Sequence, residues 1–166
     1  MATTYEKIAS STVSGSSTTT IEFGSISSAY TDLRVVLVGT LPSSNGVRIG
    51  FNSDTGNNYS YTSLRGNGTA ASSSSATNSP FIDLQQGFSW SGTYTNFNTI
   101  DIFSYAGSTY KTVLTTASLD KNGSGATTCQ VGLWRSTSAI STITFTTTAT
   151  NFTAGTTATL YGILKA

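Results

Sequence analysis

The chain has 166 residues, a length that predicts a single domain able to bury a core without disulfide or metal support. Charged residues make up only 9% of it, against about 25% in an average globular protein, and the net charge is +1. The sequence has no basic run and no apolar stretch of bilayer-spanning length, so we expect neither nucleic acid nor a membrane as a partner.

About a third of the residues are Ser or Thr, a composition that occurs both in disordered linkers and in proteins with many short strands. Aromatic residues reach 11%, there are only 2 prolines, and apolar residues alternate regularly with polar ones. These features favour strands, and no segment has a helical pattern. The sequence therefore predicts an all-β protein.

The predicted strands follow one another along the whole chain. Residues 33–38 form a near-continuous apolar run that contains Arg34, which we expect to reach solvent, to pair with a carboxylate, or to form an ion pair between subunits. The alternation of Val47, Ile49 and Phe51 with polar residues is typical of a half-buried strand. The full set of about nine or ten expected strands is 19–23, 33–38, 47–51, 59–64, 81–84, 100–102, 112–117, 129–134, 140–145 and 158–164.

The connections between these strands carry turn residues. Asn45–Gly46, Asn67–Gly68 and Asn122–Gly123 have the residue types that accept positive φ in two-residue hairpins. Residues 69–79 are nearly all Ala, Ser, Thr and Asn, and we expect a long exposed loop there. Many short antiparallel strands at even spacing predict an antiparallel β-sandwich of jelly-roll type.

We expect two parts, an N-terminal arm at residues 1–18 and a sandwich domain at 19–166. The arm has no apolar core of a signal peptide, which favours synthesis in a reducing cytoplasm. Within it, Tyr5, Glu6 and Lys7 are candidate contacts to a partner protein.

The residues needed for catalysis are scarce. The sequence contains no His, which removes Ser–His–Asp and Cys–His catalysis, and one cysteine cannot form a usual zinc site. We expect no enzyme activity, no cofactor and no metal. Asp54, with Asn52, Asn57 and Asn58, offers oxygen ligands to calcium, but an Asx-turn is the preferred interpretation. Cys129 lies in a predicted strand and is expected to be a small buried side chain.

Aromatic side chains among Ser and Gly mark residues 87–94 as the best surface candidate. Phe88, Trp90 and Tyr94 would make an adaptable contact surface, and the alternative is a loop folded over one end of the sandwich. Trp134 is expected in the core or at its end, with a ligand platform as the lesser alternative.

The C-terminal third carries a combination of motifs. Residues 131–140 read VGLWRSTSAI, residues 151–156 read NFTAGT, and residues 160–163 read LYGI. This combination resembles a family of small jelly-roll structural proteins of phage particles, common in marine and cyanobacterial phages, and the resemblance extends over roughly residues 19–164. It implies a capsid decoration protein or a tail or fibre component without catalytic residues.

Two functions remain open on this basis. The first is a capsid decoration (cement) protein on the outer head surface, which stabilises the shell, binds the major capsid protein and assembles as a homotrimer matched to a three-fold axis. The second is a tail or fibre component that binds host-surface glycan, which would need Trp90, Tyr94 or Trp134 exposed. Both place the mature protein in the virion, and a free carbohydrate-binding module is a distant third.

Overall fold

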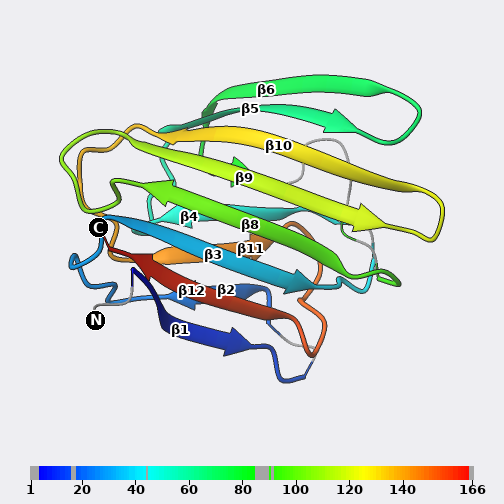
Figure 1. Ribbon diagram of the computed structural model, residues 1–166, viewed down its shortest axis with the longest axis horizontal. Coiled ribbons are helices and arrows are strands. Elements are labelled where there is room, and N and C mark those ends of the chain that lie inside the picture. Colours follow the sequence, from blue (N-terminus) through cyan, green and yellow to red (C-terminus); the bar gives the residue numbers. More distant parts are fainter. Residues whose placement is uncertain (1–3, 16–17, 44, 85–89, 91, 165–166) are drawn as a thin grey trace.

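A computed structural model, which describes residues 4–15, 18–43, 45–84, 90 and 92–164, shows an all-β protein built from two antiparallel sheets (Figure 1). The large sheet has eight strands in the order β1-β12-β3-β8-β9-β10-β5-β6, and the small sheet has four in the order β2-β11-β4-β7. No described helix is long and apolar enough to cross a membrane. The predicted β-sandwich is confirmed.

The strands are short to medium in length. Those of the large sheet are β1 (Tyr5–Thr12), β12 (Thr157–Ile163), β3 (Asp32–Gly39), β8 (Asn96–Phe103), β9 (Lys111–Asp120), β10 (Gly125–Trp134), β5 (Tyr59–Gly66) and β6 (Ala71–Ser79). Those of the small sheet are β2 (Thr20–Phe23), β11 (Ile143–Thr147), β4 (Val47–Phe51) and β7 (Ile82–Asp83).

The core lies between the two sheets because alternate side chains of each strand point to the same side. In β3, Leu33, Val35 and Leu37 are fully buried while the residues between them are partly exposed. In the small sheet, β4 and β11 contribute Ile49 and Phe145 to the same core. The apolar residues of each central strand thus determine which side of the strand faces the core.

Eight of the strands pair in a nested order. The first pairs with the last (β1 with β12), β2 pairs with β11, β3 with β8, and β4 with β7. The remaining strands form two hairpins, β5–β6 and β9–β10, which pair with each other through β5 and β10 and join the large sheet beside β8. These two hairpins widen the large sheet on one side only (Figure 1).

The sequence prediction of nine or ten strands was too low, since the described residues form twelve. The expected loop at 69–79 is wrong: Ala71–Ser79 is strand β6, which pairs with β5 from Gly66↔Ala71 onward. Ser and Ala carry no strand signal of their own, so backbone pairing with a neighbour decides this segment. The other addition is β1, whose residues we had placed in an N-terminal arm.

The arm proposed at residues 1–18 contains an edge strand. Residues of β1 pair with β12 from Tyr5↔Ile163 to Thr12↔Thr157, with a register shift between Lys7 and Ala9. A truncation at about residue 18 would therefore expose the edge of β12 as well as remove the arm.

Motif residues serve the packing of the two sheets. A Cβ on Gly162 would collide with the ring of Tyr30, and a Cβ on Gly132 would lie 2.7 Å from Cδ1 of Ile82. Phe152 is fully buried, as expected for a side chain that closes one end of the sandwich. The Asn122–Gly123 turn has positive φ at both residues (57° and 103°), which confirms the predicted hairpin type.

Candidate functional surface

In the two added hairpins, polar residues occupy some of the inward positions and apolar residues some of the outward ones. On β10, Thr128 and Gln130 point inward and are 1% exposed, while Cys129 and Val131 point outward. On β9, Thr115 is buried and Leu114 is 38% exposed. At these positions the strands present apolar side chains on the outer side of the sheet, where no other part of the described chain covers them.

The exposed apolar side chains collect on one surface. Of the eight large hydrophobic side chains that are exposed among the described residues, six lie on the outer side of the large sheet. We call five of these, on the neighbouring strands β8, β9, β10 and β5, the apolar face: Leu64, Phe97, Phe103, Leu114 and Val131. The sixth is Tyr5 on β1.

Register brings members of the apolar face into contact range. Leu114 of β9 stands opposite Val131 of β10. Leu64 of β5 stands opposite Cys129, which lies two residues before Val131 on β10. Side chains directly opposite each other on adjacent strands have Cβ atoms about 5 Å apart. The apolar face is therefore continuous across β9, β10 and β5.

One ion pair lies beside this surface. Arg34 donates two hydrogen bonds to Asp101, Nε to Oδ1 at 2.5 Å and Nη2 to Oδ2 at 2.9 Å, and Asp101 stands opposite Leu114. The hydrogen bonds that Arg34 donates to Asp101 raise the pKa of Arg34, and burial acts to lower it. The predicted pairing of Arg34 with a carboxylate is confirmed, and it leaves this part of the face without net charge.

A hollow of about 280 Å³ lies next to Val131 of the apolar face. Val131, Leu133 and Thr62 line it, together with Ser75 and Thr77 of β6. Such a depression can receive a side chain of a partner, which a flat sheet surface cannot.

On β10 and the nearby strand β8, several buried polar atoms are unsatisfied. Both amide atoms of Asn98, Oγ1 of Thr128 and Oε1 of Gln130 find no hydrogen-bond partner among the described residues. The Nε2 of Gln130 donates to the backbone oxygen of Asp83 at 2.8 Å. Burying such groups costs free energy, so the inward placement of polar residues here does not serve stability.

The predicted contact residues of the N-terminal segment lie on or beside β1. Tyr5 is 44% exposed and stacks on Tyr161 with ring centroids 4.8 Å apart. Glu6 accepts a hydrogen bond from the hydroxyl of Tyr30 at 3.3 Å. Glu6 and Lys7 are exposed. All three are accessible, at the edge of the sheet furthest from the apolar face.

Of the three aromatic residues predicted to make a contact surface, the structure shows one buried and one exposed, and it does not describe the third. Trp90 is fully buried and packs edge-on against Phe152, with centroids 6.4 Å apart, so the interpretation as a loop folded over the sandwich end holds for it. Tyr94 is 37% exposed, and Phe88 lies outside the described residues. Trp134 is 2% exposed, which confirms its predicted place in the core.

The Asx-turn predicted at Asp54 is confirmed. Its Oδ1 accepts from the backbone N–H of Gly56 at 2.9 Å, and its Oδ2 accepts from the indole Nε1 of Trp134 at 2.7 Å. Burial acts to raise the pKa of Asp54, but the hydrogen bonds from Trp134, Asn58 and Gly56 outweigh it and lower the pKa. Among the described residues, no group of three His, Cys, Asp or Glu side chains is placed to hold a metal.

Two further side chains, Cys129 and Lys111, carry potentially reactive groups. Cys129 is exposed, so its predicted burial is wrong; its neighbours Thr128 and Gln130 take the inward positions. Lys111 is fully buried, and its Nζ donates to the backbone oxygens of Gly107 at 2.7 Å and Thr109 at 2.5 Å. Burial lowers its pKa. Lys111 thus stabilises the turn that contains Gly107 and Thr109.

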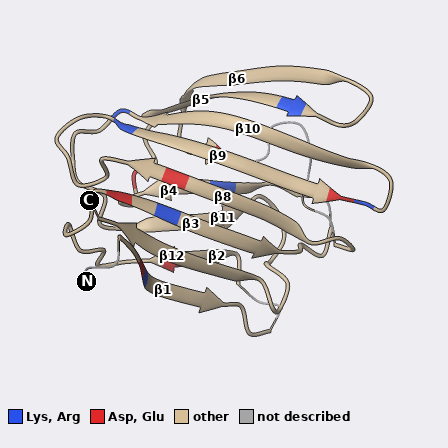
Figure 2. Cartoon of the chain, in the orientation of Figure 1, with Lys and Arg blue, Asp and Glu red and all other residues tan. Residues whose placement is uncertain are grey.

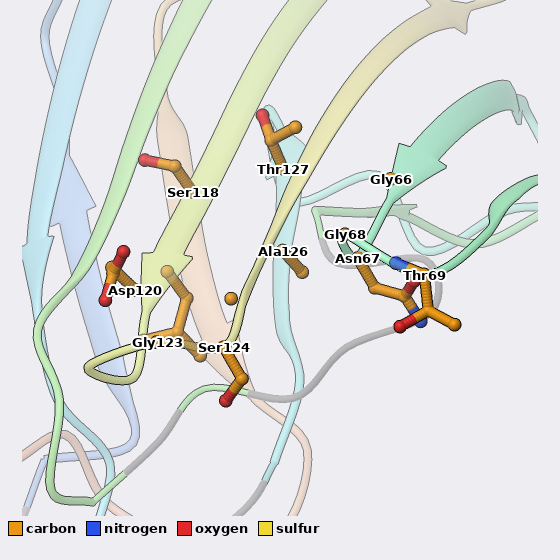
Figure 3. Close-up of a pocket in the computed structure, with 12 residues that line it drawn as sticks. Gly66, Asn67, Gly68, Thr69, Ser118, Asp120, Gly123, Ser124, Ala126 and Thr127 are labelled. Atoms are coloured by element: carbon orange, nitrogen blue, oxygen red, sulfur yellow. Dashed lines mark hydrogen bonds between the residues drawn. The ribbon is translucent and has the colours of Figure 1, made fainter.

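A larger hollow, of about 690 Å³, lies between the tips of hairpins β5–β6 and β9–β10 (Figure 3). Its side chains serve their own turns: Oδ1 of Asn67 accepts from the N–H groups of Thr69 and Ala70, and Oδ1 of Asp120 accepts from the N–H of Asn122. None of the described residues that line it is aromatic, so these residues offer no stacking surface of the kind expected of a glycan site.

Comparison with protein-family models, with curated proteins and with solved structures finds no match for this chain. The surface described above therefore rests on geometry alone. The sequence analysis did not identify these residues as a surface. The sequence does place Leu64, Leu114, Cys129 and Val131 in predicted strands, beside polar residues.

Proposed function

We propose that this chain is a structural protein of a bacteriophage particle, placed on the outer surface of the head as a decoration protein that stabilises the shell. The C-terminal motifs at 131–140, 151–156 and 160–163 support the phage family. The role requires protein partners, chiefly the major capsid protein, and neither a catalytic residue nor a cofactor.

The jelly-roll assignment is part of this proposal. Setting aside the two added hairpins leaves β1-β12-β3-β8 facing β2-β11-β4-β7, with the nested pairs β1:β12, β2:β11, β3:β8 and β4:β7. A long antiparallel hairpin rolled into two sheets gives this order, which is the arrangement of a jelly roll. The same fold occurs in capsid proteins, but fold alone does not establish function.

The observation that carries the role is the apolar face. It consists of exposed Leu, Val and Phe side chains on strands whose inward positions are partly polar. A protein that stays bound to the capsid gains affinity when such a surface is buried. Burial of apolar area contributes roughly 25 cal/mol per Å² before the costs of association. We propose that the apolar face binds the capsid and that three copies assemble around a local three-fold axis, so that weak contacts add.

A tail or fibre protein that binds host-surface glycan is the alternative. It requires Trp90, Tyr94 or Trp134 to be exposed, and both tryptophans are buried. Tyr94 is accessible, but it offers a smaller stacking surface than an exposed tryptophan would. We therefore prefer the head.

Co-sedimentation with phage heads that lack this protein tests the proposal. We expect saturable binding of the wild-type chain at a fixed ratio to the major capsid protein. The double variant Leu114→Lys/Val131→Lys places two charges in the apolar face and should bind at least tenfold more weakly. The matched control is Thr20→Lys/Thr146→Lys, two cross-strand neighbours on the small sheet, which should bind as wild type. No binding of wild type to heads, or equal binding by all three proteins, contradicts the proposal.

A further inference from the structure

The two edges of the large sheet differ in how they are protected. At one edge, β1 carries Glu6 and Lys7, and its register with β12 shifts between Lys7 and Ala9. At the other edge, β6 has nine residues without a charge or a proline. Its pairing with β5 runs without a shift from Ala71 to Ala76. Figure 2 shows β6 uncharged along its whole length, with no described strand beyond it.

An edge strand presents a row of backbone N–H and C=O groups that can pair with another strand. Monomeric proteins block such edges with charged side chains, proline or a bulge, and β1 has two of these devices. On β6 the interruptions come only after the regular part: the register shifts beyond Ala76, Asn78 has φ of 54°, and Pro80 follows the strand. No described strand pairs with the outer edge of residues 71–76, a stretch long enough for another strand to pair with.

We propose that β6 pairs antiparallel with β6 of a second copy of this chain around a two-fold axis. The contact joins the two large sheets into one continuous sheet of 16 strands, twice the eight of each chain. This inference does not depend on the virion role. On a shell, the same two-fold contact would link copies that belong to neighbouring three-fold assemblies.

A second copy is the occupant that the strand fits best. An antiparallel pair of identical strands is self-complementary, because each outward N–H of one strand meets a C=O of the other, as a two-fold interface requires. Like charges opposite each other would oppose such a pair, and 71–79 has none. The net charge of +1 adds little long-range repulsion between copies.

The single cysteine provides a direct distance test. Cys129 is exposed on β10 and stands in register with Leu64 of β5, which stands opposite Ser73 of β6. Across the proposed contact, the two Cys129 residues are five strand spacings apart, or about 24 Å at ~4.8 Å per spacing. Spin labels on Cys129 of the full chain should give a distance distribution centred near that value, measured by pulsed electron paramagnetic resonance.

A charge test separates this edge from the apolar face. The variant Ser73→Lys/Ser75→Lys changes two exposed side chains of β6, and the control Thr112→Lys/Thr116→Lys makes the same change on exposed positions of β9. We expect wild type and control to sediment as an even-numbered assembly and the β6 variant to fall to half that mass, with unchanged circular dichroism. A monomeric wild type, a β6 variant of unchanged mass, loss of the assembly in the control, or no labelled distance near 24 Å would each overturn the proposal.

Discussion

The outer sides of the two sheets are built by the same alternation, yet they differ in character. The small sheet turns Glu22, Arg48 and Thr144 outward, and Arg48 lies 3.8 Å from the centre of the Phe81 ring. The large sheet turns the apolar face outward. Both sheets already bury a full set of core residues, so folding does not require this difference. From this difference we infer that the inward sides of the sheets determine the stability of the fold, and that the outer side of the large sheet can bind a partner.

The largest expected effect separates buried from exposed aromatic residues. Trp90→Ala removes a fully buried ring that packs on Phe152 and should lower the free energy of unfolding by about 3–5 kcal/mol. Phe97→Ala, at a side chain that is 43% exposed, should cost less than about 1 kcal/mol. Chemical denaturation of both variants measures the difference. Equal losses would mean that the outer side contributes to the core.

Alkaline pH tests the inward side through Tyr59. This side chain is fully buried, and its hydroxyl accepts from the N–H of Phe51 at 3.0 Å. Burial, partly offset by that hydrogen bond, raises its pKa from 10.0 to about 12. The folded state therefore keeps a proton that the unfolded state loses above pH 10. The stability contributed by Tyr59 is present below pH 10 and is lost as the pH rises to about 12, by roughly 2–3 kcal/mol.

The control for the alkaline test is Tyr59→Phe. This variant lacks the titrating hydroxyl and should be less stable at neutral pH by about 1–3 kcal/mol, because the N–H of Phe51 loses its partner. Its stability should fall less steeply than that of wild type between pH 10 and 12. Equal slopes would assign the alkaline loss to other groups, such as Tyr61 and Tyr105, whose pKa values burial also raises.

Acid pH tests the Asx-turn where the chain enters β5. Asp54→Ala leaves the buried indole N–H of Trp134 without its acceptor and should cost about 1–2 kcal/mol. Since the pKa of Asp54 is lowered in the folded state, its contribution is present above the unfolded value of 3.8 and is lost as the pH falls through the folded value. Wild type and variant should therefore converge in stability at low pH, as measured by urea titrations at several pH values. A constant gap would contradict this role of the carboxylate.

The parts of the fold that follow from sequence are those where polarity and position agree. Val47, Ile49 and Phe51 alternate with polar residues, and they occupy the buried side of β4 as predicted. The strand β6 was missed because serine is neutral between loop and strand, and only the neighbour β5 determines its state. The site was missed for a different reason. On β10 the polar residues face inward, so a prediction from hydropathy alone assigns the wrong side, and Cys129 appears buried.

The smallest expected change in stability belongs to the most exposed apolar residue. Leu64 is 60% exposed on β5, so Leu64→Thr should alter the free energy of unfolding by no more than about 0.5 kcal/mol. The same change should shorten retention on a hydrophobic-interaction column, because it removes a large part of the apolar face. The reciprocal variant Thr62→Val adds an apolar group on the same outer side and should lengthen retention, again without a change in stability. If Leu64→Thr instead destabilises the fold by 2 kcal/mol or more, Leu64 is part of the core, and the distinction between the two sides of this sheet does not hold.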